Sequence, residues 1–252
     1  MTEERVYTAA VLIIGNEVLS GRTQDANLSY LAVGLSRAGI RLMEARVVRD
    51  DEAAIIGALN EVRARYDYVF TTGGIGPTHD DITSESVAKA FGLKLIRHPD
   101  AVRLLEAHYR PGDLNEARLR MANTPEGAVL VRNPVSRAPG FQIGNVFVLA
   151  GVPLVMQAMF DGIRDRLKGG RPQLSRAVVS TVPEGLLAKG LGEIQARYAD
   201  LEIGSYPYFR RTGYGTSLVL RGTDQARLEA ATEEVRALIR SLGGDPQDEQ
   251  PG

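Results

Sequence analysis

Along the first two thirds of the chain, short apolar runs typical of buried strands alternate with stretches whose apolar residues recur at helical spacing. Strands are predicted at residues 6–14, 42–48, 68–72, 93–96, 129–131, 140–143 and 146–149. Helices are predicted at 25–38, 51–66, 83–91 and 152–167, and 99–123 is helical with a break at 111–112. Repeated strand–helix units favour a mostly parallel sheet with helices on both faces, so we expect an α/β protein.

The run Gly169-Gly170-Arg171-Pro172 is typical of a linker. After it, the pattern changes to a strand at 177–182, a helix at 186–198, strands at 201–205 and 216–221, and a helix at 225–242. This order predicts a small α+β domain at 171–252, behind a larger domain at 1–170. The last ten residues, 243–252, are polar and rich in Pro and Gly, so we expect them to be frayed.

Composition and charge exclude several classes of function. The chain has no cysteine, so disulfides, thiolate metal sites and cysteine nucleophiles are impossible. Its formal net charge is -1, and neither the basic excess nor the clustered basic face that a nucleic-acid binder normally shows is obvious, so no nucleic-acid partner is expected. The apolar run at 9–14 is too short for a signal sequence or a membrane span. We therefore expect a cytoplasmic protein with no membrane partner.

Ligands of parallel α/β sheets bind beyond the carboxyl ends of the strands, and three segments of the chain meet that condition. The first is Gly15-Asn16-Glu17, in which Asn16 and Glu17 follow directly on a buried strand and are functional candidates. The second is the long loop from Gly73 to Thr83. The third is Gly151-Val152-Pro153, where Gly151 allows a ligand to approach the helix end, although a simple turn explains it equally well.

The loop Gly73-Gly74-Ile75-Gly76-Pro77-Thr78-His79-Asp80-Asp81-Ile82-Thr83 carries most of the chemical signal. Its glycines allow backbone N–H groups close to a ligand, and Thr78 and Thr83 add hydroxyls. The helix that begins near Thr83 presents its positive end, so the combination favours a phosphate. Neither the P-loop ending nor the Rossmann glycine spacing is present. We expect Gly76 and Pro77 to make the turn and Gly74 to serve close approach.

Asp80 and Asp81 place negative charge where the anion should bind. A divalent cation, most simply Mg²⁺, that bridges carboxylate and phosphate resolves this conflict. The alternative is that Thr83 and the two aspartates only cap the helix. The residues by themselves leave both interpretations open.

The segment Gly15-Asn16-Glu17-Val18-Leu19-Ser20-Gly21-Arg22-Thr23-Gln24-Asp25-Ala26-Asn27 resembles the amino-terminal domain of the CinA family, and the loop Gly73–Thr83 resembles that family's most specific signature. The resemblance covers roughly residues 6–168 and extends to the molybdopterin-binding domain of eukaryotic FAD synthases. Gly204-Ser205-Tyr206-Pro207 is similar to a motif in the second region of those proteins. The resemblance implies a three-layer α/β/α fold of the MoaB/Mog type and a homo-oligomer.

The resemblance also implies chemistry. Related Mog-type domains bind molybdopterin and adenylylate it with ATP and magnesium, and Asp81 matches the aspartate that supports this metal-assisted step, whereas Asp80 has no acidic counterpart there. CinA-type and FAD-synthase-type domains are instead associated with pyrophosphate hydrolysis of ADP-ribose or FAD. Ala150 departs from the family, which often has proline there. The region after the linker does not resemble an amidase or a synthase domain, so neither nicotinamide-nucleotide deamidation nor FAD synthesis is expected.

The leading hypothesis is a protein that binds a phosphorylated pterin or an adenine dinucleotide and hydrolyses its phosphoanhydride. Asp81, Asp80 and Glu17 would be catalytic, with Asp80 and Asp81 holding the metal. The expected ligand-binding residues are Asn16, Gly73, Gly74, Gly76, Thr78, Thr83 and Gly151. Two alternatives stay open, a molybdopterin adenylyltransferase and a pterin- or nucleotide-binding module without turnover.

Overall fold

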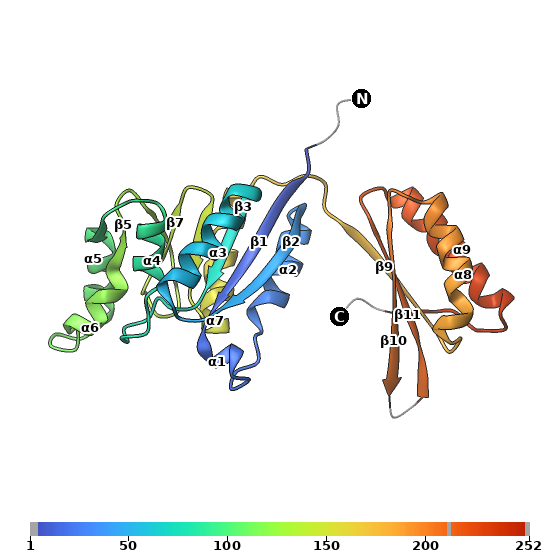
Figure 1. Cartoon of the computed structure of the whole chain (residues 1–252), viewed down its shortest axis with the longest axis horizontal. Helices are drawn as coiled ribbons and strands as arrows, with labels where there is room; N and C mark the ends of the chain where they lie inside the picture. The colour runs from blue at the N-terminus through green and yellow to red at the C-terminus, as the bar shows by residue number, and fades with distance from the viewer. Residues whose placement is uncertain (1–4, 211–212, 250–252) are drawn as a thin grey trace. The chain divides into compact units, whose positions relative to one another are not determined.

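The computed structural model describes residues 5–210 and 213–249. Contacts within the chain divide it into two compact units, Met1–Gly170 and Arg171–Gly252 (Figure 1). The first unit is built on a six-stranded sheet with the order β2-β1-β3-β8-β7-β6. Its strands are β1 (Tyr7–Ile14), β2 (Ile40–Val48), β3 (Tyr68–Thr72), β6 (Val129–Val131), β7 (Gly140–Ile143) and β8 (Val146–Leu149).

The pairing within this sheet confirms the mostly parallel architecture. β1 pairs in parallel with β2 and β3, and β3 pairs in parallel with β8. Only the hairpin of β7 and β8 and the edge strand β6 run antiparallel to their neighbours. The turn of that hairpin is at Gly144, which has a φ of 55°. The order places the carboxyl ends of β1, β3 and β8 side by side.

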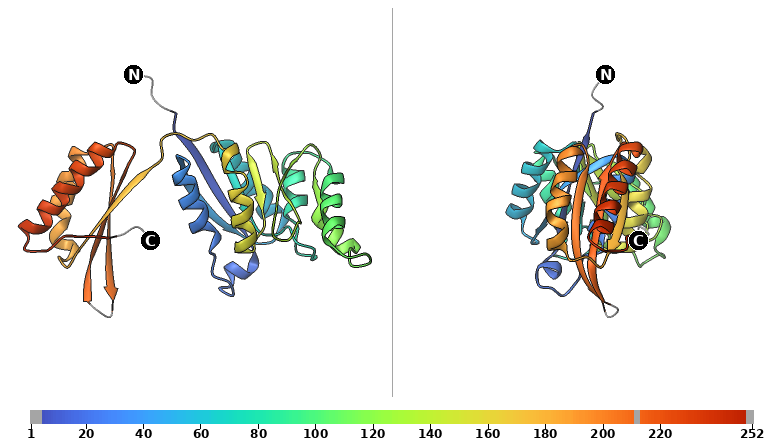
Figure 2. Two further views of the ribbon diagram at one scale, coloured as in Figure 1. Left: turned by 180° about the vertical axis from the view of Figure 1, so that it is seen from behind. Right: turned by 90° about the vertical axis from the view of Figure 1, so that its right-hand side faces the viewer.

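Helices cover both faces of the sheet (Figures 1 and 2). Alternate residues of β1 face opposite sides, so Val11 packs against α2 (Asn27–Arg37) and α7 (Pro153–Asp161). Leu12 faces the other side, where it packs with α3 (Glu52–Arg65) and α4 (Thr83–Ala90). Because both faces are covered, a strand in the middle of the sheet is apolar throughout. The three-layer α/β/α fold is confirmed.

The region between α4 and β6 is helical with a break, as predicted for 99–123. Helix α5 (Pro99–His108) precedes the break, and α6 (Glu116–Leu119) with the 3-10 turn η1 (Arg120–Ala122) follows it. The flanking strands β4 (Leu95–Arg97) and β5 (Asn123–Pro125) form a separate two-stranded sheet, in which β5 was not predicted. The helix predicted to run to 167 ends earlier, because Gly162 closes α7 and η2 (Arg164–Arg166) follows.

The second unit is a four-stranded antiparallel sheet with the order β10-β11-β9-β12. Two helices cover one of its faces, and their apolar residues pack against Leu218 and Leu220 of the sheet. The predicted βαββα order is confirmed by β9 (Leu174–Ser180), α8 (Glu184–Arg197), β10 (Glu202–Arg210), β11 (Gly213–Gly222) and α9 (Gln225–Ser241). Within the described residues of both units, no helix has the length and apolar character needed to cross a membrane.

The prediction of a frayed tail at 243–252 is wrong for its described part. Strand β12 (Gln247–Asp248) pairs with β9, and the N–H of Glu249 donates to the carbonyl of Ala177 at 3.0 Å. The segment covers an edge of β9 that would otherwise present unpaired backbone groups to water. Residues 250–252 lie outside the described residues.

We predict that residues 1–170 fold by themselves. The two apolar clusters on either side of the first sheet contain only residues of the first unit, and the cluster of the second unit contains only its own. A fragment that ends at residue 170 keeps the hydrogen bonds of Lys168 with Tyr68 and of Gly170 with Gly39. We expect cooperative thermal unfolding by circular dichroism, and a lower Tm for the matched fragment 1–166. Non-cooperative unfolding of fragment 1–170 would contradict the prediction that the first unit folds without the second.

Candidate functional site

The three segments that follow β1, β3 and β8 meet at one edge of the sheet. They enclose a cavity of about 480 Å³, which is within the range of small-molecule sites. Six of the residues expected to act at the site line this cavity: Glu17, Gly73, Gly74, Gly76, Asp81 and Gly151. The carboxyl ends of the strands, where the sequence predicted a ligand site, therefore border this cavity.

The turn after β3 is made by Gly73 and Gly74, whose φ angles are 102° and 67°. A methyl group on Gly73 would lie 2.1 Å from the carbonyl oxygen of Ile14, and one on Gly74 would lie 2.1 Å from Thr83 Oγ1. The expectation that Gly76 and Pro77 make this turn is therefore wrong. The backbone conformation and the packing both require glycine at Gly74, whatever the ligand.

Gly76 has a different role, because it makes room for the carboxylate of Asp81. A methyl group on Gly76 would lie 2.6 Å from Asp81 Oδ2. The same oxygen accepts hydrogen bonds from the N–H of Thr78 at 2.8 Å and from its hydroxyl at 2.6 Å. These contacts hold the half-buried carboxylate of Asp81 at the wall of the cavity.

Asp80 lies just outside the residues that line the cavity. Its Oδ1 is 2.5 Å from Thr78 Oγ1, and this hydrogen bond is the main cause that lowers the pKa of Asp80 below its usual value. The carboxylates of Asp80 and Asp81 thus converge on a hydroxyl that has one proton to donate. The arrangement fits a hard cation, because Mg²⁺ is commonly held by one or two carboxylates together with oxygens of a bound phosphate.

The interpretation of Thr83 and the aspartates as helix caps is wrong. The residue before α4 is Ile82, and Asp81 bonds to Thr78 instead. The expected ligand contact of Thr83 is also corrected, because Thr83 is fully buried and its hydroxyl donates to the carbonyl of Gly73 at 3.0 Å. Thr83 therefore holds the glycine turn in place through this buried hydrogen bond. Thr78 does not line the cavity, and its hydroxyl is engaged by the two aspartates.

The first segment forms the short helix α1 (Asn16–Leu19), which the sequence did not predict. Glu17 lines the cavity, and its carboxylate folds back over Gly15, where a methyl group would lie 2.6 Å from Glu17 Oε1. Asn16 is exposed and lies outside the cavity lining, and its N–H donates to Asp50 Oδ2 at 2.8 Å. Of this pair, the structure brings only Glu17 to the cavity.

Sequence reasoning missed a part of the cavity lining that comes from the region between α6 and β7, namely Met121, Asn133, Ser136 and Ala138. Asn133 organises this part of the lining. It is 4% exposed, its Oδ1 accepts from the N–H groups of Val135 and Ser136, and its Nδ2 donates to the carbonyl of Ala138 at 2.8 Å. The run Asn133-Pro134 is a turn signal that could have marked this loop, but its contact with the cavity depends on the fold.

Arg120 was missed as well. It shares a smaller cleft of about 80 Å³ with Asp81, beside the glycine loop. Among described residues, no group of three or more His, Asp or Glu side chains is suited to hold a metal. A cation at Asp80 and Asp81 would therefore need oxygens from a ligand to complete its coordination.

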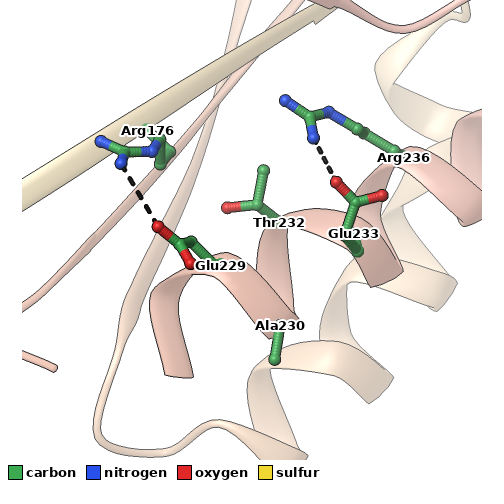
Figure 3. Close-up of a pocket in the computed structure, with 6 residues that line it drawn as sticks. All are labelled: Arg176, Glu229, Ala230, Thr232, Glu233 and Arg236. Atoms are coloured by element: carbon green, nitrogen blue, oxygen red, sulfur yellow. Dashed lines mark hydrogen bonds and ion pairs between the residues drawn. The ribbon is translucent and has the colours of Figure 1, made fainter. Parts of the chain in front are cut away.

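The second unit has a hollow of about 440 Å³ along β9 and α9 (Figure 3). Its two arginines are already paired: Arg176 Nη2 is 3.7 Å from Glu229 Oε1, and Arg236 forms ion pairs with Glu233 and Asp248. These pairs neutralise the positive charges that an anionic ligand would require. The cavity of the first unit is the better candidate site.

Comparisons with known proteins agree with this fold. Residues 10–169 match the family described as "Probable molybdopterin binding domain", and residues 172–243 match "FAD synthase, middle domain". A protein of Metallosphaera sedula is 32% identical over 95% of this chain and 97% of its own length. A CinA-like protein of Desulfosudis oleivorans is 38% identical over 65% of this chain, which is 42% of that longer protein.

Among solved structures, the protein CinA of Thermoplasma acidophilum, described as of unknown function, superimposes with a TM-score of 0.61. It is 34% identical, and the match covers 64% of this chain and 98% of that one. The chain therefore belongs to the molybdopterin-binding domain family. Within that family it is a CinA-type member with a second domain of the FAD synthase middle-domain type.

Proposed function

We propose that this protein binds a phosphorylated pterin or an adenine dinucleotide in the cavity of its first unit and hydrolyses the phosphoanhydride. One observation carries the proposal: the carboxylates of Glu17 and Asp81 line the same cavity as the backbone of the glycine turn. A phosphoanhydride needs both backbone donors for its oxygens and acidic groups that handle water and metal.

The lining of the cavity supports a ligand with a phosphate and a ring. The backbone at Gly73, Gly74 and Gly76 offers the approach for phosphate oxygens, beside Gly151. Ile75, Met121, Val152 and Val155 give the cavity an apolar surface, which favours a flat heterocycle. The match to an FAD synthase middle domain favours an adenine dinucleotide over a simple phosphate ester.

In the proposed reaction, the oxygen of a water molecule forms a bond to one phosphorus and the bridging P–O bond breaks. Glu17 orients the water and accepts its proton, and the leaving phosphate carries away the bridging oxygen. ADP-ribose would give AMP and ribose phosphate, and FAD would give AMP and FMN. Asp81, with Asp80 beside it, would hold a Mg²⁺ ion that neutralises phosphate charge when it is bound.

A second candidate is adenylyl transfer to molybdopterin. The description of the family that covers residues 10–169 favours a pterin as the ligand. In that case an oxygen of the pterin phosphate would take the place of water and attack the α-phosphorus of ATP, the bond between the α- and β-phosphates would break, and pyrophosphate would leave. Binding without turnover is the third outcome.

Turnover assays separate these functions. We expect the full chain with Mg²⁺ to release AMP from ADP-ribose or FAD, and chelation with EDTA to abolish the release. AMP release would be followed by chromatography, next to a parallel reaction with molybdopterin and ATP. If adenylylated molybdopterin forms and neither ADP-ribose nor FAD is hydrolysed, the protein is an adenylyltransferase and the proposed hydrolysis is wrong. Full hydrolysis in the presence of EDTA would show that the reaction does not require a divalent metal.

A further inference from the structure

A second, smaller cavity of about 50 Å³ also borders Glu17. It is formed by the loop after β1, the start of α2 and the end of β3, and it shares Glu17, Thr23, Gly151 and Pro153 with the larger cavity. We infer that this cavity is a binding site for a divalent cation, held by oxygens of Asn27, Thr72, Asp25 and Glu17. The site is separate from the Asp80–Asp81 pair, and the observations behind it do not use the proposed function, although both assign a role to Glu17.

Asn27 gives the first reason. Its side chain is 5% exposed, and its Nδ2 donates to the carbonyl of Gly151 at 2.8 Å. That hydrogen bond fixes the orientation of the amide, because the reverse orientation would place two oxygens against each other. Asn27 Oδ1 is therefore fixed as an acceptor, and it is buried without a hydrogen-bond partner.

Thr72 gives the second reason. It is the last residue of β3, it lines the same small cavity, and it is 1% exposed. Its Oγ1 is also buried without a hydrogen-bond partner. Unpaired buried polar atoms are rare because they lose their water without replacement. Two such oxygens at one cavity indicate that something in solution satisfies them.

The charges around the cavity select a cation. Asp25 accepts a hydrogen bond from the N–H of Leu28 at 2.9 Å, and Glu17 lies against Gly15. Within residues 5–210 and 213–249, no ion pair engages Asp25 or Glu17 with a lysine or an arginine. Carboxylate, amide and hydroxyl oxygens together are the ligands that Mg²⁺, Mn²⁺ and Ca²⁺ prefer.

The small volume favours an ion over a larger ligand. A cavity of about 50 Å³ has room for an ion and water but is far below the volume of sites that take a pterin or nucleotide ring. A cation here would fix the carboxylate of Glu17 and, through Asn27, the backbone of Gly151. Glu17 and Gly151 also line the larger cavity, so the ion would fix the positions of two residues of the ligand site.

Mn²⁺ binding to the full chain without nucleotide tests this inference, with free Mn²⁺ followed by electron paramagnetic resonance. Thr72→Val keeps the shape of the side chain and removes the unpaired oxygen. The matched control is Thr71→Val, because Thr71 is equally buried and its Oγ1 is also unpaired, but it does not line the small cavity. We expect Thr72→Val to weaken Mn²⁺ binding by about tenfold or more, and Thr71→Val to leave it unchanged.

A second variant, Asp25→Asn, keeps the inference testable if Thr72→Val does not fold. Asp25→Asn keeps an oxygen that can accept from Leu28 and removes the charge, so it should weaken Mn²⁺ binding as well. Asp80→Asn reports on the glycine loop and should leave this site occupied. Mn²⁺ binding that is unchanged in Thr72→Val and Asp25→Asn, or lost only in Asp80→Asn, would overturn the inference. Absence of Mn²⁺ binding to the wild-type chain would also overturn it, whether or not the chain hydrolyses ADP-ribose.

Discussion

Asp81→Asn is expected to lower kcat/KM for ADP-ribose by about 100-fold or more, the scale of losing one strong electrostatic contribution at a reaction centre. The substitution preserves shape, and the asparagine oxygen can still accept the hydrogen bond from the N–H of Thr78. What it removes is the negative charge at the wall of the cavity, where the proposed Mg²⁺ would bind. The rate would be measured at saturating Mg²⁺, with Tm recorded for the same sample.

Asp80→Asn is the comparison for this effect. Asp80 also bonds to Thr78 but does not line the cavity, so its loss should lower kcat/KM less than the loss of Asp81. If both variants keep wild-type rates with unchanged Tm, the carboxylates of the loop have no part in the reaction. If Asp80→Asn has the larger effect, the metal lies on the outer side of the loop.

Gly74→Ala is expected to destabilise the protein by about 2–4 kcal/mol, the sum of a strained backbone and an overpacked contact. The φ of Gly74 is 67°, a conformation that alanine rarely adopts. The new methyl group would also lie 2.1 Å from Thr83 Oγ1. Thr83 cannot move aside, because it is fully buried and its hydroxyl holds the carbonyl of Gly73. Urea denaturation gives the free energy of unfolding directly.

Gly76→Ala is the matched variant for Gly74→Ala. Gly76 is not among the residues with positive φ, and its methyl group would meet the end of the Asp81 side chain, which can turn. We therefore expect Gly76→Ala to retain most of the stability and to lose activity through a displaced Asp81. Equal stability of Gly74→Ala and the wild type would show that the loop can relax around Thr83.

The parts of the fold that could be predicted from the sequence are those where burial gives a local pattern. The ranges of β3, β6, β7 and β8 agree with their predictions, because each is a short apolar run between turn residues. Strand β5 (Asn-Thr-Pro) and strand β12 (Gln-Asp) were missed, since they are not apolar runs and exist through pairing with distant strands. No local pattern encodes such a partner.

The same distinction holds for the site. Strand order places the loops after β1, β3 and β8 at one edge, so Glu17, Asp81 and the glycines were predictable. The burial of Thr83 depends on how α4 packs against the glycine turn, and a hydroxyl in the sequence does not reveal which way it faces. Asn133 and Met121 reach the cavity from loops far along the chain, so nothing near the motifs indicates them.

The central claim is that a diphosphate binds at the glycine turn between Glu17 and Asp81. Its most direct test is a crystal structure of the full chain with Mg²⁺ and an ADP-ribose analogue whose bridging oxygen is replaced by a methylene group. We predict that the two phosphates contact the backbone of the turn at Gly73, Gly74 and Gly76, with Asp81 at the metal and Glu17 facing a phosphorus. Binding of the analogue outside this cavity, or with its phosphates pointing away from the turn, would contradict the claim.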